Sequence, residues 1–257
     1  MILNKLVNND NFSSATPSFN IESLKIFLND VLKMGRISQG MFYRFKESYF
    51  EKNKGLSEDV INQEDRVDFL ESKLEYDFMK LMLLNNFSGL YLKSSIVGLK
   101  LLNIFENIGD LCEENCKLNI ELLKLPQKIN ILSFEDLFVL TQNSLTDSLK
   151  IFSEFINIER IVLTSEEKIK DIFNESEKIC TINNELKSLN IAYKKYLLKS
   201  KENLKSINLH IEMLNKVEKI SELSTNIIEV VLWALTDIKY KCRGNSLEYF
   251  YSQDDEI

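Results

Sequence analysis

Proline and glycine are scarce in this chain. Two prolines, Pro17 and Pro126, and seven glycines punctuate 257 residues, whereas a sheet needs frequent turns that are built on these residue types. Leu, Ile, Lys, Glu and Asn dominate instead, and the apolar residues recur at the three- and four-residue spacing of amphipathic helices. The sequence therefore predicts an all-α protein.

Dense runs of lysine and arginine are also lacking, and the formal net charge is -7. Binding to a nucleic-acid backbone needs a basic stripe, so we expect no nucleic-acid partner. The most apolar stretch, residues 227–235, is far shorter than the roughly 20 residues that span a bilayer. The N-terminus lacks the pattern of a secretory signal. We expect a cytoplasmic protein that reaches a membrane only through its partners.

Cysteine and histidine are few, with four and one in the chain. Cys112 and Cys116 are not in a CxxC pair, and Cys180 and Cys242 stand alone, so a zinc site is not indicated. In a reducing compartment we expect four buried free thiols and no disulfide. The single histidine, His210, lacks the Glu-x-x-His context of a ferritin-like di-metal oxidase and is expected to be a surface or packing residue.

Signatures of catalysis are missing as well. The sequence contains no phosphate-binding loop, no nucleophile elbow and no convincing Cys/His catalytic pair. We therefore expect that the protein is not an enzyme.

Six amphipathic segments account for most of the chain. Thr164 with Glu167, and Ser133 with Asp136, resemble the capping patterns that begin helices, and Gly244 supplies a stop after the last one. The helices are expected at about residues 19–53, 58–85, 89–123, 134–158, 165–199 and 201–241.

The three helices before Pro126 are echoed by the three that follow it. Short motifs recur at offsets of 111 to 113 residues, namely Glu22-Ser23-Leu24 as Glu135-Asp136-Leu137, Glu64 as Glu175, and Glu106 with Asp110 as Glu218 with Glu222. This internal repeat predicts two tandem three-helix bundles related by a pseudo-twofold axis. The predicted divisions are a flexible N-terminal arm at 1–18, a first repeat at 19–125, a second repeat at 126–243 and an acidic tail at 244–257.

Glu106 and Asp110 are four residues apart, so they lie on one face of the third helix about a turn apart. Like charges there repel each other, and a cation or a lysine partner would relieve the repulsion. Hard cations such as magnesium, calcium or manganese, or iron, prefer such oxygen ligands. Many solvated helix faces carry the same spacing, but its recurrence in both halves favours a binding role.

Several segments in order resemble the PhoU family of phosphate-signalling proteins. Residues 99–117, LKLLNIFENIGDLCEENCK, resemble the third-helix signature of that family. Residues 216–241 resemble the matching signature of the second repeat, with Asn226-Ile227-Ile228-Glu229 as the N-I-x-E element. Residues 60–71, VINQEDRVDFLE, resemble the acidic second-helix segment. The resemblance covers about residues 19–243.

The resemblance implies metal clusters on the outward acidic faces, one in each repeat. The first site would use Glu64, Asp68, Glu106 and Asp110. Iron, zinc, manganese and magnesium are the metals to consider, and the first repeat is the better candidate for a complete site.

The second site departs from the family pattern. The resemblance assigns Glu175 and Glu218 to it, but Glu222 replaces the usual Asp and Cys180 stands where an acidic residue is expected. We therefore expect the second site to be partly or wholly empty.

The resemblance also implies a negative regulator of phosphate uptake and phosphate-responsive signalling. Such a protein binds the ATPase subunit of a phosphate ABC transporter and, where one is present, a sensor histidine kinase, and it commonly forms a homodimer. Two alternatives remain open: an accessory subunit of a phosphate permease without a signalling role, and a purely structural helical-bundle adaptor. Sustained heptads would favour the adaptor, but the apolar stripes are broad.

Overall fold

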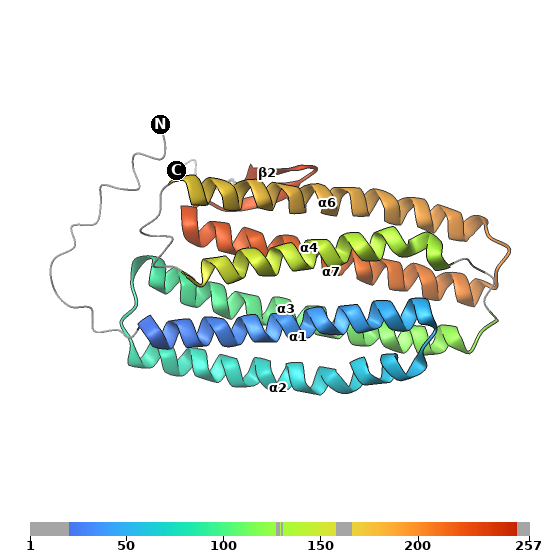
Figure 1. Ribbon diagram of the computed structural model, residues 1–257, viewed down its shortest axis with the longest axis horizontal. Helices are drawn as coiled ribbons and strands as arrows, with labels where there is room; N and C mark the ends of the chain where they lie inside the picture. Colours follow the sequence, from blue (N-terminus) through green and yellow to red (C-terminus); the bar gives the residue numbers. More distant parts are fainter. Residues whose placement is uncertain (1–20, 127–128, 130, 158–165, 251–257) are drawn as a thin grey trace, which may run out of the picture.

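The computed structural model describes residues 21–126, 129, 131–157 and 166–250. This part of the chain contains six long α-helices that run along the long axis of the molecule, followed by a short hairpin (Figure 1). The all-α prediction is confirmed apart from that hairpin. The elements are α1 (Ile21–Glu51), α2 (Lys54–Leu84), α3 (Gly89–Leu123), the 3-10 turn η2 (Ile131–Phe134), α4 (Glu135–Phe155), α6 (Glu166–Lys199), α7 (Leu204–Thr236), β1 (Tyr240–Arg243) and β2 (Ser246–Tyr249).

The helices form two groups of three that follow the predicted repeat. α1, α2 and α3 pack against one another, as do α4, α6 and α7. The groups meet through α1 against α4 and α3 against α7, which leaves α2 and α6 at opposite outer edges (Figure 1). Two tandem three-helix bundles are therefore present, and the division into separate domains stays a prediction.

Aromatic side chains join the two groups in one continuous core. Phe42 and Phe45 of α1 lie 6.2 and 5.5 Å from Phe138 of α4, measured between ring centroids. Phe105 of α3 lies 6.3 Å from Phe152 of α4. These rings are fully buried, and large buried aromatic rings dominate core energetics, so the two repeats stabilise each other.

Asparagine side chains cap two of the helices. Asn53 accepts a hydrogen bond of 3.3 Å from the backbone N–H of Leu56 at the start of α2, and Asn203 accepts one of 2.8 Å from Lys205 at the start of α7. The predicted capping role of Ser133 is wrong, because this residue lies within η2 and α4 begins without a side-chain cap. The predicted cap at Thr164 lies outside the described residues.

The end of the last helix differs from the prediction. α7 ends at Thr236 rather than near Lys241, because Asp237 adopts a left-handed conformation with φ of 61°. β1 then pairs with β2 in an antiparallel hairpin, and Gly244, with φ of 57°, lies in its turn. Residues 246–249 are thus a strand rather than part of a tail, and the rest of the predicted tail, beyond residue 250, lies outside the described residues.

Two of the four cysteines are bonded to each other. Cys180 of α6 and Cys242 of β1 form a disulfide whose Cα atoms lie 5.3 Å apart. The expectation of four free thiols is wrong for this pair, because the hairpin brings Cys242 onto α6. Cys112 and Cys116 are free and buried, as expected.

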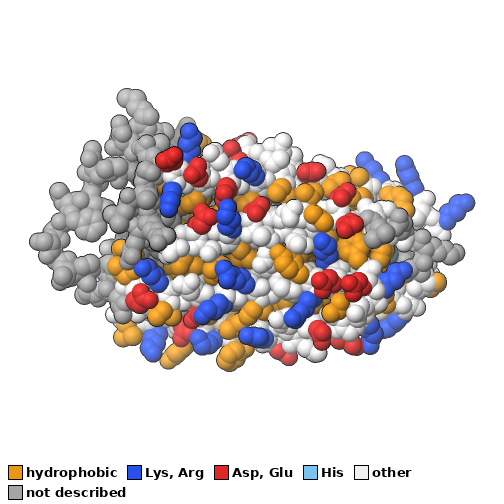
Figure 2. All heavy atoms as spheres, in the orientation of Figure 1, with side chains coloured by type: hydrophobic (Ala, Val, Ile, Leu, Met, Phe, Trp, Pro, Cys, Tyr) orange, Lys and Arg blue, Asp and Glu red, His pale blue; other side chains and the backbone are white. Residues whose placement is uncertain are grey.

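The surface mixes charge with apolar side chains. On the face in view, acidic and basic groups are interspersed, with hydrophobic groups between them (Figure 2). The outer side of α2 exposes Phe69, Tyr76 and Leu83 by 66%, 70% and 81%. Within the described ranges, no helix combines the length and hydrophobicity that are needed to cross a bilayer.

Candidate metal centre

The first carboxylate face lies where α2 and α3 pack against each other. Val67 on α2 is fully buried, and a Cβ atom added to Gly109 on α3 would lie 3.3 Å from it. The glycine therefore allows the two helices to approach closely at this point. Glu64 and Asp68 precede and follow Val67 along α2, and Asp110 follows Gly109, so the close contact brings carboxylates of both helices together.

Three carboxylates converge at this contact. One oxygen from each of Glu64, Asp68 and Asp110 lies within 4.8 Å of the other two. Oxygen ligands lie about 2.0 to 2.6 Å from a magnesium or calcium ion, so two ligands of one ion are separated by at most about 5 Å. The arrangement fits a hard divalent cation, and an all-oxygen donor set favours magnesium, manganese or calcium.

The electrostatics of Glu64 reflect this crowding. Burial contributes most to its shift, followed by a hydrogen bond with Asp68 and the negative charges of Asp68, Asp110 and Glu113, and together they raise the pKa of Glu64 to about 8. Without a cation this carboxyl therefore holds a proton near neutral pH.

Glu106 extends the face along α3. Burial, then the negative charges of Asp110 and Glu71, raises the pKa of Glu106 to about 7. A hydrogen bond with Asp110 contributes in the same direction, so Glu106 joins the cluster through Asp110. The structure thus brings together all four residues that the sequence assigned to the first site.

Two further carboxylates belong to this face, although the assigned set omitted them. Glu71 has a raised pKa because of burial and the charges of Glu75, Asp68 and Asp110. Glu113 forms an ion pair of 2.6 Å with Lys117 at the edge of the cluster. Glu71 is three residues beyond Asp68, and Glu113 is three beyond Asp110, so helical spacing was the signal that could have identified both.

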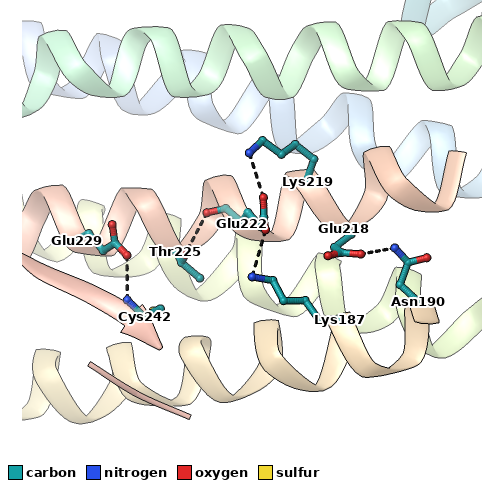
Figure 3. Close-up of polar contacts among 8 residues, drawn as sticks. All are labelled: Lys187, Asn190, Glu218, Lys219, Glu222, Thr225, Glu229 and Cys242. Carbon is teal, nitrogen blue, oxygen red and sulfur yellow. Dashed lines mark hydrogen bonds and ion pairs between the residues drawn. The ribbon is translucent and has the colours of Figure 1, made fainter. Parts of the chain in front are cut away.

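On the corresponding face between α6 and α7, side chains of the protein itself pair with the carboxylates. The Lys187 and Lys219 ammonium groups lie 3.1 and 3.0 Å from the two carboxylate oxygens of Glu222 (Figure 3). Burial alone would raise the pKa of Glu222, but the hydrogen bonds and charges of both lysines outweigh it and lower the pKa. The Asn190 amide donates a hydrogen bond to Glu218 (Figure 3). Two lysines therefore compensate the charge of Glu222, and Glu218 is held by a hydrogen bond.

The predicted placement of Glu175 in the second site is wrong. Glu175 forms an ion pair of 3.0 Å with Lys150 of α4, and it precedes Lys187 by twelve residues on α6, or about 18 Å along the helix axis. Residues 156–165 separate α4 from α6, whereas residues 52 and 53 separate α1 from α2. α6 is thus displaced from the position that a uniform repeat offset predicts, and Lys187 rather than Glu175 lies beside Glu222.

The same shift explains Cys180, which was expected opposite the α7 carboxylates. It is bonded to Cys242 instead. His210 has a packing role, as expected: its ring is fully buried and lies 6.0 Å from both the Tyr49 and Phe134 rings, measured between centroids.

Comparison with known proteins shows similarity to PhoU proteins. Residues 31–118 match the PhoU domain. Over 231 residues the chain is 26% identical to the phosphate-specific transport system accessory protein PhoU homolog 2 of Thermotoga maritima, covering 89% of this chain and 92% of that protein. The chain is thus similar to a PhoU homolog over most of its length.

Solved structures of PhoU proteins share the fold. The phosphate transport system regulatory protein PhoU from Streptococcus pneumoniae superposes with a TM-score of 0.67 at 16% identity, covering 85% of this chain and 98% of that one. PhoU from Pseudomonas aeruginosa gives a TM-score of 0.68 at 14% identity, covering 84% and 98%.

The match to the PhoU domain coincides with the acidic face. Residues 31–118 include Glu64, Asp68, Glu106 and Asp110. The two copies of the Glu-x-x-x-acid motif are therefore chemically unequal. α2 and α3 carry crowded carboxylates, whereas on α7 two lysines pair with Glu222 and an amide donates a hydrogen bond to Glu218.

Proposed function

We propose that this chain is a PhoU-family protein that regulates phosphate uptake and phosphate-responsive signalling by binding other proteins rather than by catalysis. Its similarity to PhoU proteins supports this, since these are named as an accessory protein of phosphate-specific transport and as a regulatory protein of phosphate transport. The direction of regulation is negative, so that the protein limits uptake when phosphate is plentiful.

The partners we propose are the ATPase subunit of a phosphate ABC transporter and, where one is present, a sensor histidine kinase. The protein works in the cytoplasm as a homodimer and associates with the membrane only through these partners. The exposed side of α2 supports a protein-binding mode, because Phe69, Tyr76 and Leu83 are exposed and repeat every seven residues, which suits an approaching helix.

The observation that carries the mechanism is the convergence of Glu64, Asp68 and Asp110 within 4.8 Å. We propose that these three, together with Glu106, bind a hard divalent cation. The bound cation supplies the positive charge that otherwise comes from protons on Glu64 and Glu106. The α2/α3 face thereby changes its charge with metal loading, and this sets the surface that partners meet.

The experiment is phosphate uptake in cells grown with ample phosphate. Deletion of the gene is expected to raise the uptake of labelled phosphate, and reintroduction of the wild-type gene is expected to return uptake to its original low level. The Glu106→Gln/Asp110→Asn variant is expected to lower uptake only slightly. The matched pair on α7, Glu218→Gln/Glu222→Gln, is expected to lower it as fully as the wild type does.

Two outcomes separate the parts of this proposal. Uptake that is unchanged by the deletion would contradict the regulatory function. Equal restoration by both variants would leave the regulation in place but remove the acidic α2/α3 face from its mechanism.

A further inference from the structure

The C-terminal hairpin is fastened to the middle of α6. The disulfide between Cys180 and Cys242 joins residues that are 62 positions apart. Two hydrogen bonds hold Asn245 in the turn: Thr181 donates to its backbone carbonyl at 3.3 Å, and Asn184 donates to its side-chain oxygen at 2.9 Å. One strand and the turn of the hairpin therefore depend on a short stretch of α6.

The hairpin also covers a buried carboxylate on α7. Glu229 is only 8% exposed. It accepts a hydrogen bond of 3.0 Å from the backbone N–H of Cys242 (Figure 3). It also forms an ion pair with Lys241. Both donors come from β1. Because a buried carboxylate that loses its donors is strongly destabilising, Glu229 and the hairpin hold each other in place.

The two cysteines of the disulfide differ in exposure. Cys180 is 1% exposed, whereas Cys242 lies partly open to solvent on β1. Cys112 and Cys116 are fully buried thiols within α3. A thiol that approaches from solvent therefore meets Cys242 first.

We propose that Cys180 and Cys242 form a reversible redox site, which a dithiol reductant opens, and that its opening releases the hairpin from α6 and α7 and uncovers Glu229. One thiolate of the reductant attacks Sγ of Cys242, a mixed disulfide forms, and Cys180 leaves as a thiolate that takes up a proton. The second thiol of the reductant then displaces Cys242, which also becomes a thiol. Two electrons pass to the protein, and the reductant leaves as a disulfide.

Opening of the disulfide changes the surroundings of one of three glutamates on α7. Glu218, Glu222 and Glu229 lie at spacings of four and seven residues on one side of the helix. In the bonded form each has a donor from the chain: Asn190 for Glu218, two lysines for Glu222 and the hairpin for Glu229 (Figure 3). Release of the hairpin withdraws the donors of Glu229 alone, so the acidity of this face follows the state of the disulfide and is independent of the metal centre.

The test combines thiol counting with hydrogen exchange on the full chain. Alkylation after denaturation without reductant is expected to label the two cysteines of α3, and treatment with dithiothreitol beforehand is expected to add the other two. After reduction, amide exchange in residues 240–249 is expected to accelerate at least about tenfold, as local opening would produce. Exchange in α2 and α3 is expected to stay the same.

A Cys180→Ser/Cys242→Ser variant provides the matched control, with rapid exchange in the hairpin whether or not dithiothreitol is present. Labelling of all four cysteines without prior dithiothreitol would overturn the proposal, because the disulfide would then be absent. Equal hairpin exchange before and after reduction would overturn it as well, because the hydrogen bonds to Asn245 and Glu229 alone would then hold the hairpin.

Discussion

At the scale of single residues, burial and neighbouring carboxylates raise the pKa values of Glu64 and Glu106 to about 8 and about 7. The folded protein holds these protons more tightly than the unfolded chain does. The stability that they contribute is therefore complete below about pH 4.5 and is lost as the pH rises through 7 to 8.

We predict that the metal-free protein becomes less stable between pH 5 and pH 8.5. After allowance for solvent screening the loss is about 1 to 2 kcal/mol, or about 2 to 6 °C in Tm. Thermal unfolding in the presence of a chelator measures it. A Glu64→Gln/Glu106→Gln variant, which keeps the hydrogen-bonding shape without the charge, is expected to flatten the curve. An unchanged slope in that variant would contradict the assignment.

A substitution at Gly35 tests the packing of α1 against α3 and α4. A Cβ atom at this position in α1 would lie 2.7 Å from the Phe105 ring and 2.9 Å from a methyl group of Leu149. Gly35→Ala is expected to lower the free energy of unfolding by about 1 to 3 kcal/mol through overpacking. Gly40, on the same helix, has no atom within 4 Å of such a Cβ.

Urea unfolding of Gly40→Ala is the matched control, and this variant is expected to gain about 0.5 to 1 kcal/mol from helix propensity alone. Equal effects of the two substitutions would show that the contact of α1 with Phe105 and Leu149 is looser than described.

At the scale of helices, the register between α6 and α7 decides which face can hold a metal. Lys187 and Lys219 occupy the position of a cation beside Glu222. We predict that Lys187→Glu/Lys219→Gln creates a second metal site of about one equivalent, because it restores a cluster of hard oxygen ligands. Elemental analysis after incubation with manganese measures the gain.

The matched control is Lys195→Glu/Lys199→Gln, which changes the net charge equally at exposed positions of α6. It is expected to add no metal. An equal gain in both variants would show that bulk charge, rather than the geometry around Glu222, governs binding.

The elements show what could and could not be predicted from the sequence. Apolar periodicity was sufficient for the six helices, and α3 begins and ends at the predicted residues 89 and 123. Offsets between motifs were not sufficient for register, because Lys187 rather than Glu175 lies beside Glu222 of α7. The hairpin was missed because Gly244 was interpreted as a helix stop, although Gly-Asn between short strands also signals a hairpin.

The first site was predictable for a related reason. The Glu-x-x-x-Asp spacing places Glu106 and Asp110 on one helix face regardless of the partner helix. The partners Glu64 and Asp68 came from the family resemblance of residues 60–71, and the contact of Val67 with Gly109 brings them to Asp110. The disulfide could not be predicted, since it depends on the hairpin.

At the scale of the whole molecule, a duplicated six-helix fold carries two unequal faces. The α2/α3 face crowds carboxylates together, and the α6/α7 face neutralises its carboxylates with lysines and with the hairpin. The central claim is that this protein binds metal on the first face alone.

Elemental analysis of untagged protein, purified without chelator and incubated with magnesium, manganese or ferrous iron, tests this claim most directly. The comparison is between the wild type, Glu106→Ala/Asp110→Ala and the matched Glu218→Ala/Glu222→Ala, with helicity checked by circular dichroism. We predict about one or more equivalents of metal in the wild type and in the α7 variant, and loss of that metal in the α3 variant. Folded wild-type protein that retains no metal, or equal loss in both variants, would contradict the account.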